Sequence, residues 1–131
     1  MKPNGSRKVV IFFFFSFPVP SGYPQNVQAL TISSTEIVVT WDPVLEIERN
    51  GIIGRYEVQF NQSALSEISQ VNFMETEATN LTLLLQNLQE FVEYSIAVRA
   101  YSSVGAGPFS PAVNNQTFED GEWACVNQAG S

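Results

Sequence analysis

Apolar and polar residues alternate along most of the chain between residues 26 and 118, which is the pattern of half-buried β-strands. Turn-forming Gly, Pro, Asn and Asp residues separate the alternating runs. No segment favours a helix. The inward positions of the four clearest strands are Ile37, Val39 and Trp41; Tyr56, Val58 and Phe60; Leu81, Leu83 and Leu85; and Tyr94, Ile96, Val98 and Ala100.

A first strand from Asn26, a weaker strand over 68–74 and a last strand over 112–118 bring the expected total to seven. Seven short strands in about 100 residues are typical of an all-β, immunoglobulin-like β-sandwich. An immunoglobulin domain proper would join its two sheets through a cysteine pair, whereas this chain has a single cysteine, Cys125. We therefore expect a sandwich with no disulfide, held together by packing.

Five motifs in order carry a more specific resemblance. They are Pro24-x-Asn26-Val27, Ser34-Thr35-x-Ile37-x-Val39-x-Trp41-x-Pro43, Asn50-Gly51-x-Ile53-x-x-Tyr56-x-Val58-x-Phe60, Leu88-x-x-x-x-x-Tyr94-x-Ile96-x-Val98-x-Ala100 and Gly105-x-Gly107-Pro108-x-Ser110. Together they resemble a fibronectin type III domain over residues 23–120. The chain departs from the family at Glu90 and Val92, where a proline and a threonine are usual.

The resemblance implies a structural core built on Trp41, Tyr56, Leu88 and Tyr94, with Trp41 as its largest side chain. Tyr94 resembles the tyrosine corner, in which the hydroxyl forms a hydrogen bond with the chain upstream. Fold alone does not fix function, but the family consists of non-catalytic modules.

Both ends of the chain differ from its middle. Residues 1–21 contain a basic start and an apolar run, Val9 to Phe17, which is shorter than the ~20 residues that span a bilayer. This leader fits a secretory signal, although its four consecutive Phe are atypical; it equally fits a translated pyrimidine-rich intron end. The codons of residues 120–123 can likewise contain an intron donor. We therefore expect the module to occupy 22–121, with 122–131 as a tail, and the spliced transcript decides between the alternatives.

Charge and composition exclude several functions. The chain has 13 acidic and 6 basic residues, and residues 22–121 retain only Arg49, Arg55 and Arg99 against all the acids except Glu122, a net charge of −9. Such a module should repel nucleic acid and anionic lipid, so neither nucleic-acid binding nor membrane insertion is expected. The absence of histidine excludes Ser-His-Asp catalysis and His-ligated metals.

Paired carboxylates at Glu46 and Glu48 are read as a solvated edge rather than a glycosidase pair, because no pocket or substrate-binding aromatic accompanies them. Calcium is not expected either, since Asp42 and Asp120 are the only aspartates. No catalytic residue, cofactor or metal site is therefore predicted. Three glycosylation motifs begin at Asn61, Asn80 and Asn115, and plain surface asparagine is the alternative at each.

Two loops are candidates for contacts with other proteins. Their residues are Leu45, Glu46, Glu48 and Arg49 in one, and Ser102 and Val104 in the other. Neither the Arg-Gly-Asp tripeptide nor the Trp-Ser-x-Trp-Ser motif occurs in the chain. The resemblance implies an extracellular interaction or spacer module of an adhesion, receptor or matrix protein, beside other β-modules. Similar domains occur in tandem in receptor tyrosine phosphatases and neural adhesion proteins. The alternatives are an accessory domain of a secreted enzyme and a passive structural link.

Overall fold

A computed structural model describes residues 19–63 and 71–120 of the chain. Within these residues the chain forms seven strands and one turn of 3-10 helix. They are β1 (Gln25–Thr31), β2 (Ile37–Asp42), η1 (Glu46–Glu48), β3 (Arg55–Gln62), β4 (Asn72–Glu77), β5 (Thr82–Leu85), β6 (Glu93–Tyr101) and β7 (Val113–Gln116). The all-β prediction is confirmed, and η1 is a single helical turn that the alternation did not predict.

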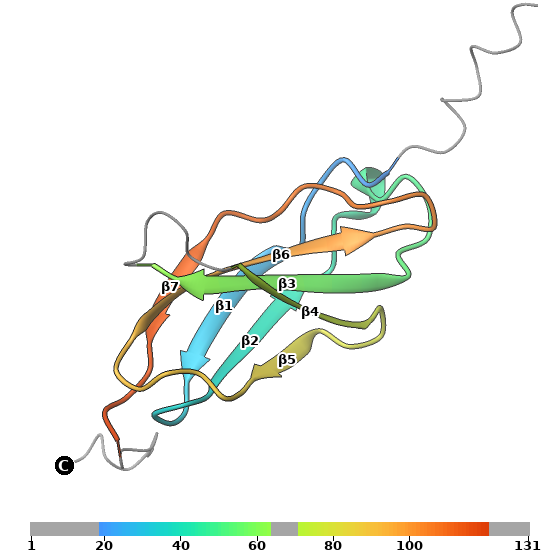
Figure 1. The fold of residues 1–131 in the computed structure, drawn as a ribbon. Coiled ribbons are helices and arrows are strands. Elements are labelled where there is room, and N and C mark those ends of the chain that lie inside the picture. The colour runs from blue at the N-terminus through green and yellow to red at the C-terminus, as the bar shows by residue number, and fades with distance from the viewer. Residues whose placement is uncertain (1–18, 64–70, 121–131) are drawn as a thin grey trace, which may run out of the picture.

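The strands form two antiparallel sheets that pack face to face (Figure 1). One sheet has the order β1-β2-β5 and the other has the order β4-β3-β6-β7. The longest register joins β3 to β6, from Arg55 opposite Tyr101 to Gln62 opposite Tyr94. This pairing sets the side chains of the two central strands directly opposite one another on both faces of their sheet.

Inward-facing side chains of both sheets fill the space between them. The buried apolar residues of this core are Ile37, Val39, Trp41, Val44, Tyr56, Val58, Phe60, Leu85, Leu88, Tyr94, Ile96, Val98 and Ala100. The Trp41 and Tyr56 rings meet edge to face with their centroids 5.4 Å apart. Trp41, Tyr56, Leu88 and Tyr94 are each no more than 7% exposed, so the structure places all four residues of the expected core between the sheets.

Three strands differ in detail from the sequence-based expectation. β4 begins at Asn72 and ends at Glu77, later than the expected strand over 68–74, of which residues 68–70 lie outside the described residues. β7 covers Val113–Gln116 and is shorter than the expected strand over 112–118, although the Thr117 N–H just beyond its end still donates to the Val92 carbonyl. β5 begins at Thr82, after the expected strand position Leu81, and Leu84 on its outward face is half-buried.

Tyr94 anchors the turn before β6. Its hydroxyl oxygen accepts a hydrogen bond of 2.9 Å from the backbone N–H of Gln89, five residues upstream. The turn therefore forms without the proline and threonine that are usual in the family.

We predict that Tyr94→Phe lowers the free energy of unfolding by about 0.5–1.5 kcal/mol, because the Gln89 N–H loses its acceptor. Urea denaturation monitored by circular dichroism measures the change. Tyr23→Phe is the matched control, since Tyr23 is 37% exposed and should change stability by less than about 0.5 kcal/mol. Equal stability of the Tyr94 variant and the parent chain would show that the bond contributes nothing.

Candidate functional site

The antiparallel strands bring two candidate loops to the same end of the sandwich. We call this end the N-terminal pole and define it as residues 19–24, 43–54, 78–81 and 102–112 (Figure 1). The first loop, residues 43–54, follows β2, where Pro43 cannot continue the strand ladder. Val44 is fully buried and fixes the loop to the core, and the Nε of Arg49 donates 2.8 Å to the Val44 carbonyl. The turn at Asn50 and Gly51 has φ angles of 51° and 138°, which these two residue types tolerate best.

The second loop, residues 102–112, is closed by its own hydrogen bonds. The Ser102 N–H donates 2.9 Å to the Gly105 carbonyl, and the Val104 N–H donates 3.1 Å to the Ser102 hydroxyl. Ser102 is 7% exposed, so it shapes the loop and is not available at the surface. Val104 is 52% exposed and faces the first loop across a hollow of about 660 Å³, which is also lined by Ile52 and Arg55.

The first described residues of the chain lie between these loops. The Ser21 N–H donates 2.9 Å to the Glu48 carbonyl, the Asn50 amide donates 3.1 Å to the Val19 carbonyl, and Pro20 is fully buried. Val19 to Ser21, which precede the expected start of the module at residue 22, contact it directly. The backbones of Pro20 and Gly107 approach closely at this contact. A Cβ on Gly107 would lie 2.9 Å from both the Cβ and the carbonyl oxygen of Pro20, so only glycine fits there without a shift.

We predict that Gly107→Ala destabilises the domain by about 1–3 kcal/mol, since the added methyl has to displace the backbone of Pro20. Thermal unfolding of the purified variant measures this. Gly54→Ala is the control in the neighbouring loop, because nothing lies within 4 Å of its Cβ position. If the two variants had the same melting temperature, the docking of residues 19–21 would be unimportant for stability.

Exposed apolar side chains distinguish this pole. Leu45 is 51% exposed, Ile47 is 84% exposed and Ile52 is 87% exposed. Of the residues expected to make contacts, Glu46 is exposed, and Glu48 and Arg49 are half-buried. Sequence reasoning missed Ile47 and Ile52. Their signal was present in the high aliphatic content of residues 43–54, which also include Val44, Leu45 and Ile53.

A second hollow of about 340 Å³ lies on the other side of Ile52. Arg49 and Tyr56 line it together with Pro43, Gly51, Ile52, Ile53 and Ala78. Burial raises the pKa of the Tyr56 phenol above its ordinary value, while the positive charge of Arg49 acts in the opposite direction. The hollow therefore combines apolar walls with one cationic group.

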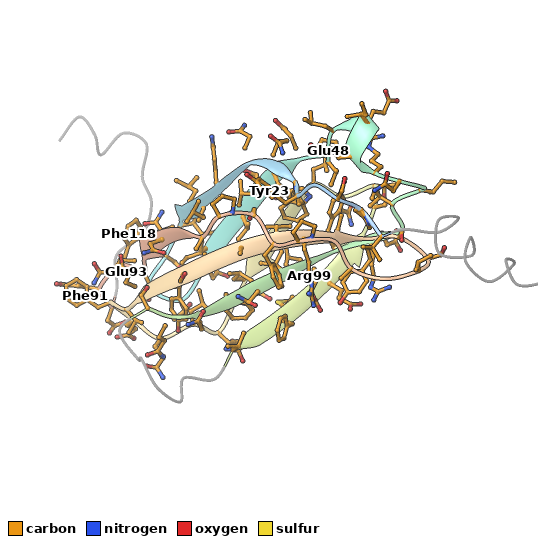
Figure 2. All side chains as sticks on the ribbon, turned by 90° about the horizontal axis from the view of Figure 1, so that it is seen from above. Tyr23, Glu48, Phe91, Glu93, Arg99 and Phe118 are labelled. Atoms are coloured by element: carbon orange, nitrogen blue, oxygen red, sulfur yellow. The ribbon has the colours of Figure 1, made fainter. Side chains whose placement is uncertain are left out.

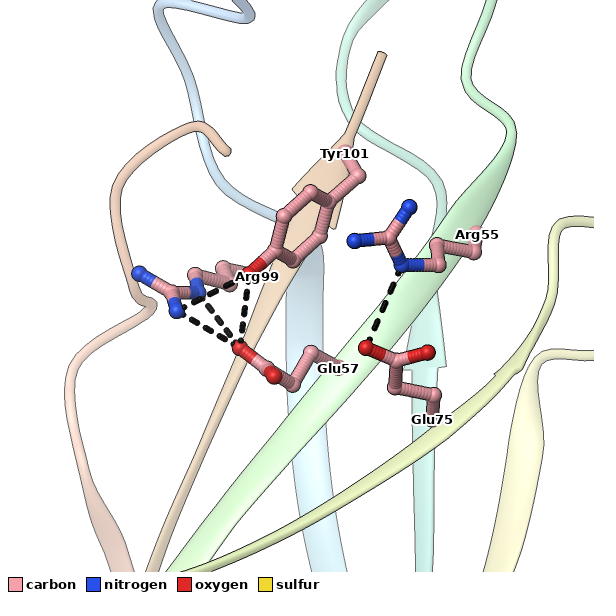
Figure 3. A network of polar contacts seen from close by, with 5 residues as sticks. All are labelled: Arg55, Glu57, Glu75, Arg99 and Tyr101. Atoms are coloured by element: carbon pink, nitrogen blue, oxygen red, sulfur yellow. Dashed lines mark hydrogen bonds and ion pairs between the residues drawn. The ribbon is translucent and has the colours of Figure 1, made fainter. Parts of the chain in front are cut away.

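The outer face of the β4-β3-β6-β7 sheet carries a polar network (Figure 3). Glu57 Oε1 accepts hydrogen bonds of 2.8 Å from Arg99 Nε and 3.2 Å from the Tyr101 hydroxyl, and Arg99 Nη2 lies 2.7 Å from the same oxygen. The Arg55 guanidinium lies 3.7 Å from the Tyr101 ring centroid, and its Nε is 3.3 Å from Glu75. Glu57 is 7% exposed and its charge is matched within the sheet, so this network is structural.

The three glycosylation motifs lie in different environments. Asn80 is exposed in the turn before β5, where its Nδ2 donates 2.8 Å to Thr76 Oγ1. Asn61 is half-buried, with its Nδ2 3.4 Å from the Gln62 carbonyl. Asn115 donates 2.6 Å from Nδ2 to the Ala29 carbonyl and so joins β7 to β1. A glycan at Asn115 would replace one of the two Nδ2 hydrogens, so the sugar would have to be accommodated beside this bond between β7 and β1.

Among residues 19–63 and 71–120, no three His, Cys, Asp or Glu side chains are grouped closely enough to hold a metal ion. In the same residues no helix has the length and hydropathy needed to cross a bilayer. Cys125 and the leader up to residue 18 lie outside the described residues.

Comparison with known proteins agrees with this architecture. The family model of the fibronectin type III domain matches residues 22–116, and the chain belongs to that family. Over 103 residues, 76% of the chain, it is 45% identical to receptor-type tyrosine-protein phosphatase F of Mus musculus and 35% identical to the cell adhesion molecule Dscam1 of Drosophila melanogaster. The crystal structure of the FN5 domain of Drosophila Lar superimposes with a TM-score of 0.64 at 29% identity, covering 76% of this chain and 98% of that one.

The chain spans about 5% of the length of these curated relatives. Its similarity to the phosphatase is therefore confined to a segment that a fibronectin type III module accounts for. Relatives that are a receptor and a cell adhesion molecule support a module that interacts with other proteins.

Proposed function

We propose that this chain is a non-catalytic module of a cell-surface adhesion or receptor protein, and that it binds another protein through its N-terminal pole. The observation that carries the proposal is the group of exposed aliphatic side chains on two loops that the core holds in place. Ile47, Ile52 and Val104 are 84%, 87% and 52% exposed there. Apolar side chains grouped on an exposed surface mark sites of protein contact more often than single exposed residues do.

The loops are suited to recognition because their backbones are fixed. Val44 anchors one loop in the core, Ser102 closes the other, and the Ser21 N–H ties the incoming chain to Glu48. A surface that is ordered before binding loses less conformational entropy when the partner arrives. Extracellular placement follows from the same proposal, since the relatives are named as a receptor and a cell adhesion molecule.

Binding of the purified chain to animal cell surfaces tests the proposal. We expect Ile47→Ser, Ile52→Ser and Val104→Ser to weaken binding, with at least one of them costing about tenfold, as expected where a few central side chains dominate an interface. Leu30→Ser is the matched control, because Leu30 is 63% exposed on β1 and lies outside the N-terminal pole. Melting curves verify that all four variants fold.

Two other outcomes would contradict the proposal. Binding that none of the three substitutions alters would leave the passive structural link as the better account of the module. Neighbouring exons that encode a catalytic domain, in place of further β-modules and a membrane span, would favour the accessory domain of a secreted enzyme.

A further inference from the structure

Arg49 differs from the other two described arginines in having no acidic partner. Arg55 pairs with Glu75 and Arg99 pairs with Glu57, whereas Arg49 makes no ion pair within the described residues. The only hydrogen bond of its side chain within the described residues uses Nε, which donates to the Val44 carbonyl. Among residues 19–63 and 71–120, nothing pairs with the remaining guanidinium nitrogens, and Arg49 lines the 340 Å³ hollow with its apolar walls. This volume is at the small end of ligand pockets and suits a single large side chain.

The opposite end of the sandwich carries a turn with matching chemistry. We call it the Phe91 turn and define it as residues 89–93, between β5 and β6. Phe91 is 58% exposed and lies near Glu93 (Figure 2), and both Glu93 and Glu90 are exposed. The turn thus presents one aromatic ring between two carboxylates.

Phe91 is held in an unfavourable conformation. Its φ of 50° lies in the left-handed region, which is costly for a residue with a bulky side chain. Hydrogen bonds fix the backbone on both sides, from the Phe91 N–H to the Phe118 carbonyl and from the Val92 N–H to Thr117 Oγ1. A strained, rigid turn that displays an aromatic ring to solvent is the kind of outlier from which a function is inferred.

We propose that the Phe91 turn of one copy of this chain docks into the Arg49 hollow of a second copy. The Phe91 ring lies between Ile52 and Tyr56, and Glu90 or Glu93 accepts hydrogen bonds from the Arg49 guanidinium. Charge complementarity selects this occupant, because Arg49, which has no acidic partner in the described part of the chain, lies at one pole and the aromatic ring with its neighbouring carboxylates lies at the other. The inference rests on the proposed function, because it names the partner of part of the N-terminal pole.

The positions of the two surfaces determine how copies of the chain would assemble. The two surfaces lie at opposite ends of the same molecule, so the contact is heterologous and repeats head to tail. One side chain in one hollow buries a small area, so the association is weak. The net charge of −7 opposes it at low salt, but at 0.15 M salt this repulsion is screened beyond about 8 Å while contacts at hydrogen-bond distance persist.

Sedimentation velocity of the full chain at 0.15 M salt, up to about 1 mM, tests the proposal. We expect association that increases with concentration. Ile52→Glu should prevent docking into the hollow, because the new carboxylate would repel Glu90 and Glu93 of the second copy. The variant should still fold, because Ile52 is 87% exposed. Phe91→Asn disables the turn and keeps the fold, since asparagine tolerates a positive φ. Each variant alone should associate at least about tenfold more weakly than the parent chain.

Mixing the two variants gives the decisive result. The Phe91→Asn chain retains an intact hollow and the Ile52→Glu chain retains an intact turn, so an equimolar mixture should form a dimer that grows no further. Leu30→Glu is the control for added negative charge, and it should associate like the parent chain. Association driven by residues 1–18 would be insensitive to both substitutions.

Three results would overturn the inference: a parent chain that stays monomeric, variants that associate as the parent does, or a mixture with no dimer. None of these results contradicts the proposed function, which is tested separately by cell-surface binding of the Ile47, Ile52 and Val104 variants and by the neighbouring exons. Thermal melting of each variant distinguishes lost docking from lost folding.

Discussion

Trp41→Ala should cost the domain about 3–5 kcal/mol of unfolding free energy, a large part of the whole stability of a domain this size. Trp41 is 3% exposed and packs edge to face on Tyr56 at 5.4 Å, so truncation leaves a cavity between the two sheets. With no second cysteine in the chain, no disulfide can join the sheets and offset the loss. Urea denaturation followed by far-ultraviolet circular dichroism measures the shift.

Two further variants establish the cause. Trp41→Phe should cost less than Trp41→Ala, because it retains a ring and removes an indole N–H that has no hydrogen-bond partner among the described residues. Ile52→Ala should change stability by less than about 0.5 kcal/mol, since Ile52 is 87% exposed. If Trp41→Ala had the same denaturation midpoint as the parent chain, the packing of Trp41 would not stabilise the core.

The alternation of residues was sufficient to predict the sandwich because both sheets have one face in the core. Ile37, Val39 and Trp41 alternate in sequence and are all buried, as are Tyr56, Val58 and Phe60. A shift of one residue in the pairing of such a strand would move all its buried apolar side chains to the solvent face. The edge strand β4 carries no such constraint, since five of its six residues are exposed, and its bounds were the least well predicted.

The N-terminal pole was only partly predictable, for a different reason. The sequence indicated which loops are unusual, but exposure in a loop depends on which side chains the neighbouring segments cover. Val44 and Leu45 are adjacent and both aliphatic, yet one is fully buried and the other is 51% exposed. The contact of Pro20 with Gly107 joins segments 87 residues apart in sequence, and no local pattern indicates it.

Predicting the Glu57–Arg99 pair also requires more than local sequence, but only the pairing register of β3 with β6. Alternation shows only that both residues lie on the outward faces of their strands. The register of β3 with β6 places them directly opposite one another. Once that register is known the ion pair follows, because opposite charges on facing positions attract and the pleat brings their side chains together.

Arg99→Met should destabilise the domain by about 2–4 kcal/mol, the second-largest effect we expect. The substitution leaves the Glu57 carboxylate, whose side chain is only 10% exposed, with the Tyr101 hydroxyl as its remaining partner in the network. It also removes the stack of the Arg99 guanidinium on Phe109, at 4.2 Å from the ring centroid. Urea denaturation at neutral pH measures the loss.

The double variant Glu57→Met with Arg99→Met separates the charge from the packing. Because no buried charge is then left without a partner, it should be more stable than Arg99→Met alone and within about 1 kcal/mol of the parent chain. Arg55→Met is the exposed comparison, since the Arg55 and Glu75 side chains are 43% and 51% exposed, and it should cost about 1 kcal/mol or less. If the double variant were less stable than Arg99→Met, the network would stabilise the sheet through packing on Tyr101 and Phe109, and not through the pairing of its charges.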